Sequence, residues 1–394
     1  MIEVTGIAQQ AAWQANEPPP VEQVRPGLWS IPVPLPNTPL RYVLVYVLEL
    51  PDGVAIVDAG WETPDAWTAL TAGLRVGGFA VTDVRAILIT HVHPDHYGMA
   101  GRVRAESGGW IGLHRLEAES LPGRYGAVDA MISRGRAWLR AAGAPEEEAA
   151  ELAGSSRDLL SMVRMAEPDR LIEDGEVVPL PGWQVRAIWT PGHTPGHLCF
   201  HEERTGVLLS GDHVLPRISP NISAHPLQQP DPLRAFLDSL AKVGDLDVGE
   251  VLPAHEYRFR GLSDRVADLR AHHEQRLAEL HALVARQPGA TTWQLAEQLP
   301  WRRPWAEITG FHRRAAVGET LAHLRLLASR GLATTSATSP SSAGAGAGAG
   351  VGADVGVGAG TAAGPGADET ERWTATRAVE PIGAGGRGPQ HPME

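Results

Sequence analysis

The sequence predicts an α/β domain, followed by a small helical domain and a disordered tail. Apolar runs such as YVLVYVLEL, VAIVDAG and VRAILIT have the length of buried strands and alternate with helical segments. From Ser263 onward the apolar residues recur at helical spacing, and no strong strand pattern follows. Beyond Thr334 the chain is rich in Ala and Gly and has few side chains that could bury a core.

Composition excludes several classes of protein. The 394 residues carry a formal net charge of -12, which argues against a basic surface over the whole molecule for nucleic acid. The single cysteine, Cys199, excludes an intramolecular disulfide and a thiolate-rich zinc site. The first residues lack the pattern of a signal peptide, and YVLVYVL is too short to span a bilayer. We therefore expect a cytoplasmic protein with no membrane partner.

The N-terminal half shows the signals of strands, turns and helices in turn. Residues 1–25 are polar and contain the run PPP, which predicts a flexible leader. YVLVYVLEL and VAIVDAG, separated by PDG, predict a hairpin in which Gly53 supplies the unusual backbone angle. Thr63 followed by Pro64 predicts the start of a helix. VRAILIT predicts a strand that is covered on both faces, with a helix beginning near His96.

The second half predicts the domain boundaries. Residues 115–170 lose strand character and become rich in Ala, Glu and Arg, which predicts a helical insertion. Strands resume with WQVRAIWT, HLCFHEE, VLLSGDH and GEVLPAHE, so the first domain should span 26–260. A long amphipathic helix and two further helices in 261–332 predict a winged-helix-like domain, although no wing is visible in the sequence. Residues 333–394 form the predicted disordered tail.

Four polar side chains crowd the end of the predicted strand VRAILIT. His91 and His93 lie two apart, so in an extended segment both side chains leave the same face. Asp95 and His96 follow, where the chain turns into a helix. Imidazole nitrogen and carboxylate oxygen are both zinc ligands. The cluster therefore has the chemistry of two adjacent metal sites.

Three later segments repeat the pattern of a strand followed by a tight loop with a potential ligand. They are TPGHTPGH with His193, LLSGDH with Asp212, and VLPAHE with His255. A lone histidine is more often a hydrogen-bonded core or surface residue than a ligand, but this repetition favours a metal centre over scattered histidines. We place His114, His197 and His213 outside the ligand set.

In this order, the motifs HxHxDH, TPGHTPGH, SGD and PAH resemble those of the metallo-β-lactamase superfamily, over about residues 28–257. The resemblance implies an αββα sandwich with two divalent ions at its edge, zinc first and iron or manganese as alternatives. The ligands that it implies are His91, His93 and His193 for one ion, Asp95, His96 and His255 for the other, and Asp212 as a bridge between both.

The ligand set also resembles that of particular branches. It is more similar to hydroxyacylglutathione hydrolases and lactamase-beta-2-like hydrolases than to β-lactamases with a cysteine ligand. The flavin-linked diiron branch carries Glu in place of His93, which disfavours a role in oxygen reduction. The resemblance implies attack by a metal-bound hydroxide that Asp95 orients. We expect a small-molecule acyl substrate, foremost a thioester or an ester.

Cleavage of single-stranded RNA is the second interpretation, because some lactamase-beta-2-like relatives carry out that reaction. Between Arg286 and Leu332 there are seven arginines and three glutamates, a balance of +4 that is a mild indication of nucleic-acid contact. The whole chain is rich in arginine, however, and no stretch combines aromatic and basic residues for base stacking. Nucleic acid is therefore the second choice of partner.

The loop LPRISPNIS follows Asp212 and, with residues 115–170, is expected to border the substrate pocket. Arg217 could pair with a carboxylate or phosphate of the substrate, and Ser219 and Asn221 could donate hydrogen bonds to it. An ordinary proline-rich connection is the alternative.

Overall fold

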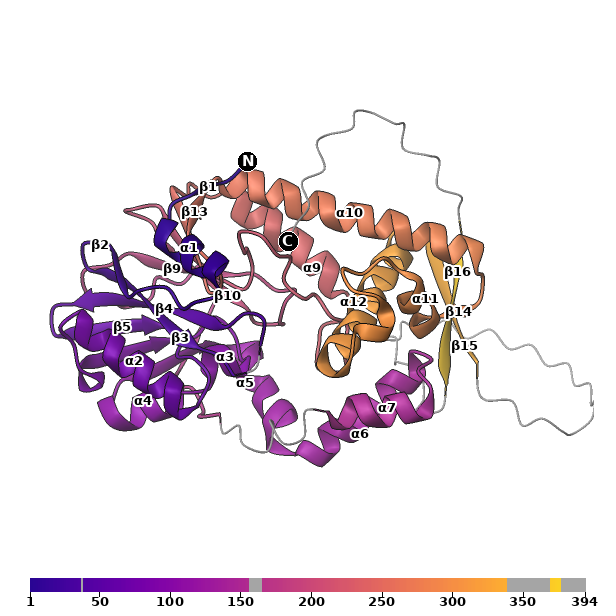
Figure 1. The fold of residues 1–394 in the computed structure, drawn as a ribbon, viewed down its shortest axis with the longest axis horizontal. Helices are drawn as coiled ribbons and strands as arrows, with labels where there is room; N and C mark the ends of the chain where they lie inside the picture. The colour runs from indigo at the N-terminus through magenta and orange to yellow at the C-terminus, as the bar shows by residue number, and fades with distance from the viewer. Residues whose placement is uncertain (37, 156–164, 339–368, 377–394) are drawn as a thin grey trace, which may run out of the picture. The chain divides into compact units, whose positions relative to one another are not determined.

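The computed structural model describes residues 1–36, 38–155, 165–338 and 369–376 (Figure 1). These residues divide into two compact units. Unit 1 contains 1–131 and 165–276; unit 2 contains 132–155, 277–338 and 369–376. None of the described helices combines the length and the hydropathy that a membrane span requires.

The first sheet of unit 1 has seven strands in the order β2-β3-β4-β5-β6-β7-β8. They are β2 (Glu22–Arg25), β3 (Leu28–Pro34), β4 (Tyr42–Leu50), β5 (Gly53–Val57), β6 (Val84–Leu88), β7 (Trp110–His114) and β8 (Arg170–Ile172). Pairing is antiparallel from β2 to β5, which confirms the predicted hairpin, and parallel from β5 to β8. The carboxyl ends of β5 and β6 therefore lie at the same edge.

The second sheet of unit 1 has six strands in the order β1-β13-β12-β11-β10-β9. They are β1 (Glu3–Val4), β9 (Val185–Trp189), β10 (Leu198–Glu202), β11 (Val207–Gly211), β12 (Glu250–Pro253) and β13 (Phe259–Arg260). Only β11 and β12 pair in parallel among these described strands. The three loops that carry His193, Asp212 and His255 follow β9, β11 and β12.

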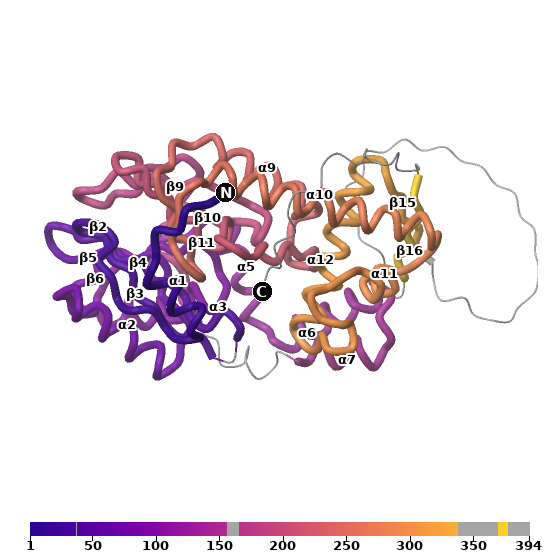
Figure 2. The backbone as a smooth tube through the Cα atoms, turned by 45° about the horizontal axis from the view of Figure 1, so that its top comes forward, coloured from indigo at the N-terminus to yellow at the C-terminus, as the bar shows by residue number. Residues whose placement is uncertain are grey.

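A shared core joins the two sheets of unit 1. Buried apolar side chains of both sheets, such as Leu44 of β4 and Phe200 of β10, form one cluster between them. On the outer face of the first sheet, α2 (Pro64–Val76) and α4 (Ala100–Ser107) contribute Leu70 and other residues to a second cluster. Figure 2 follows the chain through these layers.

The outer side of the second sheet is covered by α9 (Pro232–Gly244), which has buried apolar residues along one face. The Ser239 hydroxyl of α9 donates a hydrogen bond of 2.8 Å to the carbonyl of Pro191, directly beyond β9. The His213 ring after β11 lies edge-on to Phe236 of α9, with 5.1 Å between the ring centroids. The order of layers is helix, sheet, sheet, helix, which confirms the expected αββα sandwich.

The expectation of a flexible leader over residues 1–25 is wrong. The segment contains β1, β2 and the helix α1 (Ile7–Ala15). Gln9 is buried, donates to the Ser30 hydroxyl at 3.1 Å and accepts from the backbone nitrogen of Arg258 at 3.0 Å. The polar composition concealed this order, because the amide of Gln9 is satisfied by partners far away in the sequence.

Unit 2 is mainly helical. Its helices are α7 (Glu146–Gly154), α11 (Thr292–Gln298), the 3-10 turn Trp305–Glu307, α12 (Gly310–Ser329), most of α6 (Val128–Ala141) and the end of α10 (Leu262–Arg286). A small sheet has the order β14-β16-β15, made of β14 (Ala290–Thr291), β15 (Ala333–Thr338) and β16 (Thr370–Ala375). The sequence placed the domain boundary at 260, whereas the units divide inside α10, between Arg276 and Leu277.

The insertion 115–170 is divided between the two units. It contains α5 (Arg115–Leu121), a π-helical turn (Pro122–Gly126), α6 and α7. Leu139 of α6 and Leu152 of α7 pack with Trp293 and Val317 in the core of unit 2. The prediction that this whole segment belongs to the first domain is therefore wrong, because its apolar face is buried in unit 2.

The expectation of a disordered tail from residue 333 is wrong for β15 and β16. These strands pair antiparallel over six residues each, from Ala333 opposite Ala375 to Thr338 opposite Thr370. Trp373 is 2% exposed, and its indole nitrogen donates to the Thr292 hydroxyl at 3.1 Å. The Trp373 side chain therefore supplies the core contact that the Ala- and Gly-rich residues around it cannot make. The rest of the predicted tail lies outside the described residues.

Candidate metal centre

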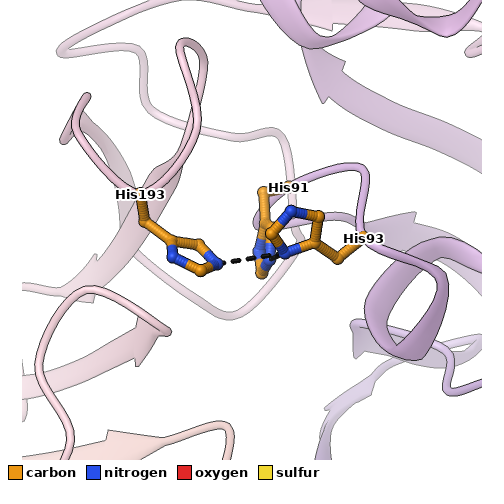
Figure 3. Close-up of side chains that lie close together, drawn as sticks. All are labelled: His91, His93 and His193. Atoms are coloured by element: carbon orange, nitrogen blue, oxygen red, sulfur yellow. Dashed lines mark hydrogen bonds between the residues drawn. The ribbon is translucent and has the colours of Figure 1, made fainter. Parts of the chain in front are cut away.

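The first ligand group consists of His91, His93 and His193, whose rings turn toward one another (Figure 3). His91 Nε2 and His193 Nε2 lie 2.9 and 3.0 Å from His93 Nδ1. Burial, followed by the neighbouring imidazoles, lowers the pKa of His91 below its usual value. Burial is also the main reason why the pKa values of His93 and His193 are lowered. Three neutral rings with converging nitrogen atoms are a typical donor set for zinc.

The second ligand group consists of Asp95, His96 and His255. The helix α3 (Pro94–Tyr97) begins directly after His93, with Pro94 at its first position, and this turn presents Asp95 and His96. Asp95 Oδ2 lies 3.6 Å from Nε2 of His96 and 3.6 Å from Nε2 of His255. Two imidazoles and a carboxylate thus converge beside the first group.

Asp212 faces both groups. Its Oδ2 lies 3.6 Å from His193 Nε2, and its Oδ1 lies 3.6 and 3.3 Å from Nε2 of His96 and His255. Burial opposes the ionised form, but His255 and His96 outweigh burial and hold the pKa of Asp212 well below its usual value. A carboxylate that presents one oxygen to each group has the arrangement of a bridging ligand.

Unsatisfied polar atoms test whether these residues fit metal ions. Within the two ligand groups and Asp212, three buried atoms find no hydrogen-bond partner among the described residues: His96 Nε2, His255 Nε2 and Asp212 Oδ1. Such atoms cost about 1–3 kcal/mol each when they stay unpaired. A bound ion would satisfy these three atoms, and imidazole with carboxylate suits zinc as well as iron or manganese. The residues therefore fit two divalent ions.

Contacts behind the ligands fix the ring orientations. Asp58 Oδ2 lies 2.8 Å from His96 Nδ1, and the Thr90 backbone nitrogen donates to Asp58 Oδ1 at 2.9 Å. His255 Nδ1 donates to the Tyr42 carbonyl at 2.8 Å. Burial alone would lower the pKa of His96, but three surrounding carboxylates outweigh burial and raise it. Because Nδ1 of His96 and of His255 is held by these contacts, Nε2 of each ring stays free to face Asp95, the third member of the second ligand group.

The sequence analysis did not identify two residues that shape the site, Asp58 and Glu117. Asp58 follows β5, and only the parallel pairing of β5 with β6 brings it to His96. Glu117 of α5 is fully buried, and its carboxylate accepts hydrogen bonds from the backbone nitrogens of Val92 at 3.0 Å and Gly196 at 2.6 Å. It therefore ties together the two loops of the first ligand group. Nothing in the local sequence distinguishes this glutamate from a surface residue of a helix.

His197, which the sequence analysis set apart from the ligands, supports Asp212. Its Nδ1 lies 2.8 Å from the Thr190 hydroxyl, and its Nε2 accepts a hydrogen bond of 3.2 Å from the Asp212 backbone nitrogen. Both ring nitrogens are thus engaged. His114 stacks on Trp189 with 5.5 Å between centroids and is also outside the converging set.

The backbone of the loop after Asp212 contacts the first ligand group at His193. The Asn221 carbonyl accepts a hydrogen bond of 2.9 Å from His193 Nδ1. The Arg217 backbone nitrogen donates to Glu256 Oε2 at 3.1 Å, and the Ser219 hydroxyl lies 3.3 Å from His273 Nε2. The substrate roles of the Arg217, Ser219 and Asn221 side chains stay predictions.

Comparison with a family model and with solved structures identifies proteins that are similar to this chain. Residues 38–255 match the family model of the metallo-beta-lactamase superfamily. A metallo-beta-lactamase family protein from Thermus thermophilus is 33% identical, with a TM-score of 0.68, over 80% of this chain and 97% of that chain. A beta-lactamase domain protein from Burkholderia ambifaria is 27% identical, with a TM-score of 0.70, over 85% of this chain and 95% of that chain.

Curated relatives match shorter parts. The lactamase-like protein adaB of Aspergillus niger is 30% identical over 33% of this chain, and the match spans only 39% of adaB. The atrochrysone carboxyl ACP thioesterase dmxR1 of a Cryptosporiopsis species is 25% identical over 64% of this chain and 62% of its own length. The probable metallo-hydrolase YqjP of Bacillus subtilis is 25% identical over 68% of this chain and 84% of its own length.

Proposed function

Because the chain belongs to the metallo-beta-lactamase superfamily, we propose that it is a binuclear metal-dependent hydrolase of thioesters or esters. The observation that carries the proposal is the position of Asp212, which presents one oxygen to each ligand group. A purely structural zinc site is closed by four ligands, whereas two adjacent groups that share a carboxylate are typical of hydrolytic centres.

Bound divalent ions would supply activation of water and polarisation of the substrate carbonyl. The chain's own residues hold and orient the reactants. Asp95 is 15% exposed in its side chain, more than the neighbouring ligands His96 and His255, and its carboxylate can accept a hydrogen bond from the attacking water. We assign Asp95 as the catalytic residue that orients the nucleophile. Burial of the surrounding histidines keeps bulk water from competing for these contacts.

An acyl substrate is supported by the similarity to a protein named as an acyl-carrier thioesterase. No serine or cysteine nucleophile is required, since Cys199 is buried in β10 and burial raises its pKa to about 12. Among divalent ions we propose zinc, with iron or manganese as alternatives, because imidazole nitrogen predominates among the ligands.

For unit 2 we propose a winged-helix-like fold. The helices α11 and α12 are followed directly by β15, which pairs with β16 to form an antiparallel wing-like ribbon. This order is the one expected of a helix-turn-helix followed by a wing. Together with the +4 balance between Arg286 and Leu332, it keeps single-strand-specific RNA cleavage as the second candidate function.

A side-by-side assay tests the proposal. Metal content is measured on the freshly purified protein, and hydrolysis is followed with acyl-CoA and acyl-glutathione thioesters, simple esters, lactones, a β-lactam and a single-stranded RNA. We expect up to two ions per chain and cleavage of a thioester or ester that Asp95→Asn abolishes. Asp65→Asn, at the exposed start of α2, is the matched control. Cleavage of RNA alone would instead establish the nuclease, and less than one ion per chain would refute the metal centre.

A further inference from the structure

Arg124 carries a positive charge near the ligand groups and has no role in the metal centre described above. It lies in the π-helical turn Pro122–Gly126, which follows α5. Its Nε and Nη2 atoms are buried, and no described residue accepts a hydrogen bond from either of them. A guanidinium group stays charged at physiological pH, so two buried donors without a partner indicate a missing acceptor.

The turn that carries Arg124 is held against the first ligand group. The hydroxyl of Tyr125 donates a hydrogen bond of 2.8 Å to the carbonyl of Val92, which stands between His91 and His93 in the chain. Tyr125 is the next residue in the same turn, so this hydrogen bond also holds the backbone of Arg124 near the first ligand group. The charge of Arg124 is thus fixed beside the site rather than on a free loop.

Among the described residues, the carboxylates that surround the site are already engaged. Both oxygens of Glu117 accept backbone hydrogen bonds from the ligand loops. Asp95 and Asp212 face the imidazoles of the two ligand groups. Divalent ions held by those groups would add further positive charge near the guanidinium. Since none of the described residues accepts a hydrogen bond from Nε or Nη2, an anion from outside the protein is the partner that would balance Arg124.

We propose that Arg124 binds an anionic group of the substrate, a carboxylate or a phosphate, and thereby selects acidic thioesters or esters. Nε and Nη2 lie on one edge of the planar guanidinium group, and this edge can donate two parallel hydrogen bonds to a single carboxylate or phosphate. The proposal rests on the hydrolase function proposed above and specifies its class of substrate.

The test compares substrates that differ in one anionic group. Butyryl and succinyl thioesters of N-acetylcysteamine differ in a carboxylate, and butyryl-CoA adds phosphates to the leaving group. In Arg124→Gln we expect KM for an acidic substrate to rise about 10- to 100-fold, the range for a lost charged hydrogen-bond pair, with KM for the neutral thioester unchanged. The succinyl and CoA arms show which anion is recognised. Arg124→Lys keeps the positive charge but cannot donate two parallel hydrogen bonds, so its KM for the acidic substrate should lie between those of the unmodified protein and Arg124→Gln.

Two controls keep the outcomes separate. Arg115→Gln makes the same change in an exposed arginine of α5 that pairs with Glu119 at 2.9 Å, and it should behave as the unmodified protein. Calorimetric titration of the metal-loaded proteins with succinate and with inorganic phosphate measures anion binding without turnover. Weaker anion binding by Arg124→Gln would support the site even if no thioester were hydrolysed. Equal anion binding, or an equal change in KM for neutral and acidic thioesters, would overturn it.

Discussion

Replacement of Asp58 by Asn should weaken metal binding without disturbing the fold. Asp58 is buried directly after β5, at a φ of 62° that Asn tolerates as well as Asp does. The Asn side chain can keep one oxygen for Thr90, but its amide nitrogen cannot accept the hydrogen bond from His96 Nδ1, which is 2.8 Å long. His96 then loses the partner that directs Nε2 toward the second ligand group.

The loss of such a partner behind a metal ligand typically lowers affinity 10- to 100-fold, or about 1.4–2.7 kcal/mol. Competition with a chromophoric chelator measures the affinity for each ion, and circular dichroism checks the fold. We expect the weaker binding in one of the two ions only. Asp52→Asn serves as the control, because Asp52 is exposed and lies 3.8 Å from Arg85. Unchanged affinity in Asp58→Asn, or an equal loss in the control, would refute the role assigned to Asp58.

Three further outcomes follow from the described contacts. Glu117→Gln should lower kcat by about tenfold, because one side-chain atom becomes a donor facing the backbone nitrogen of Val92 or Gly196; unchanged kcat would contradict this. Although burial raises the pKa of Glu250, its hydrogen bonds and neighbouring arginines lower it overall. In urea unfolding, the advantage of the unmodified protein over Glu250→Gln should therefore be full above about pH 4.5 and disappear as the pH falls through the lowered pKa. A stability difference between the two proteins that does not change with pH would contradict this role of the Glu250 carboxylate. Trp373→Ala should destabilise unit 2 by about 3–5 kcal/mol in chemical unfolding, and a loss below about 1 kcal/mol would mean that β16 is not part of its core.

The candidate metal ligands could be named from the sequence because each is part of a local pattern, and the structure brings them together. Strand, tight loop and ligand recur at His91, His193, Asp212 and His255, and the order of these segments alone indicates the family. The residue types could be read from the sequence, whereas only the structure shows that these side chains are buried and converge. Asp58 differs in this respect, since its function depends on which strand lies beside β5 rather than on its neighbours in the chain.

The two wrong predictions at the ends of the chain have one physical cause. The polar or Ala/Gly-rich composition of both ends indicates disorder, but a few side chains with partners far away in the sequence fix the structure of these segments. Gln9 is satisfied by Ser30 and Arg258, and Trp373 is buried against residues near Thr292. Such contacts join residues that are far apart in sequence, so neither periodicity nor propensity within a short window reveals them.

The candidate ligands come from both sheets of unit 1, and this has a consequence for biosynthesis. His91, His93, Asp95 and His96 follow β6, whereas Asp212 and His255 follow β11 and β12 of the other sheet. A nascent chain therefore exposes four potential ligands long before the ribosome has produced the last. An ion captured at that stage would meet an open, incomplete coordination sphere and exchange readily. Tight retention becomes available only when the second sheet has docked, so a metal that resists chelation would report that this unit has finished folding.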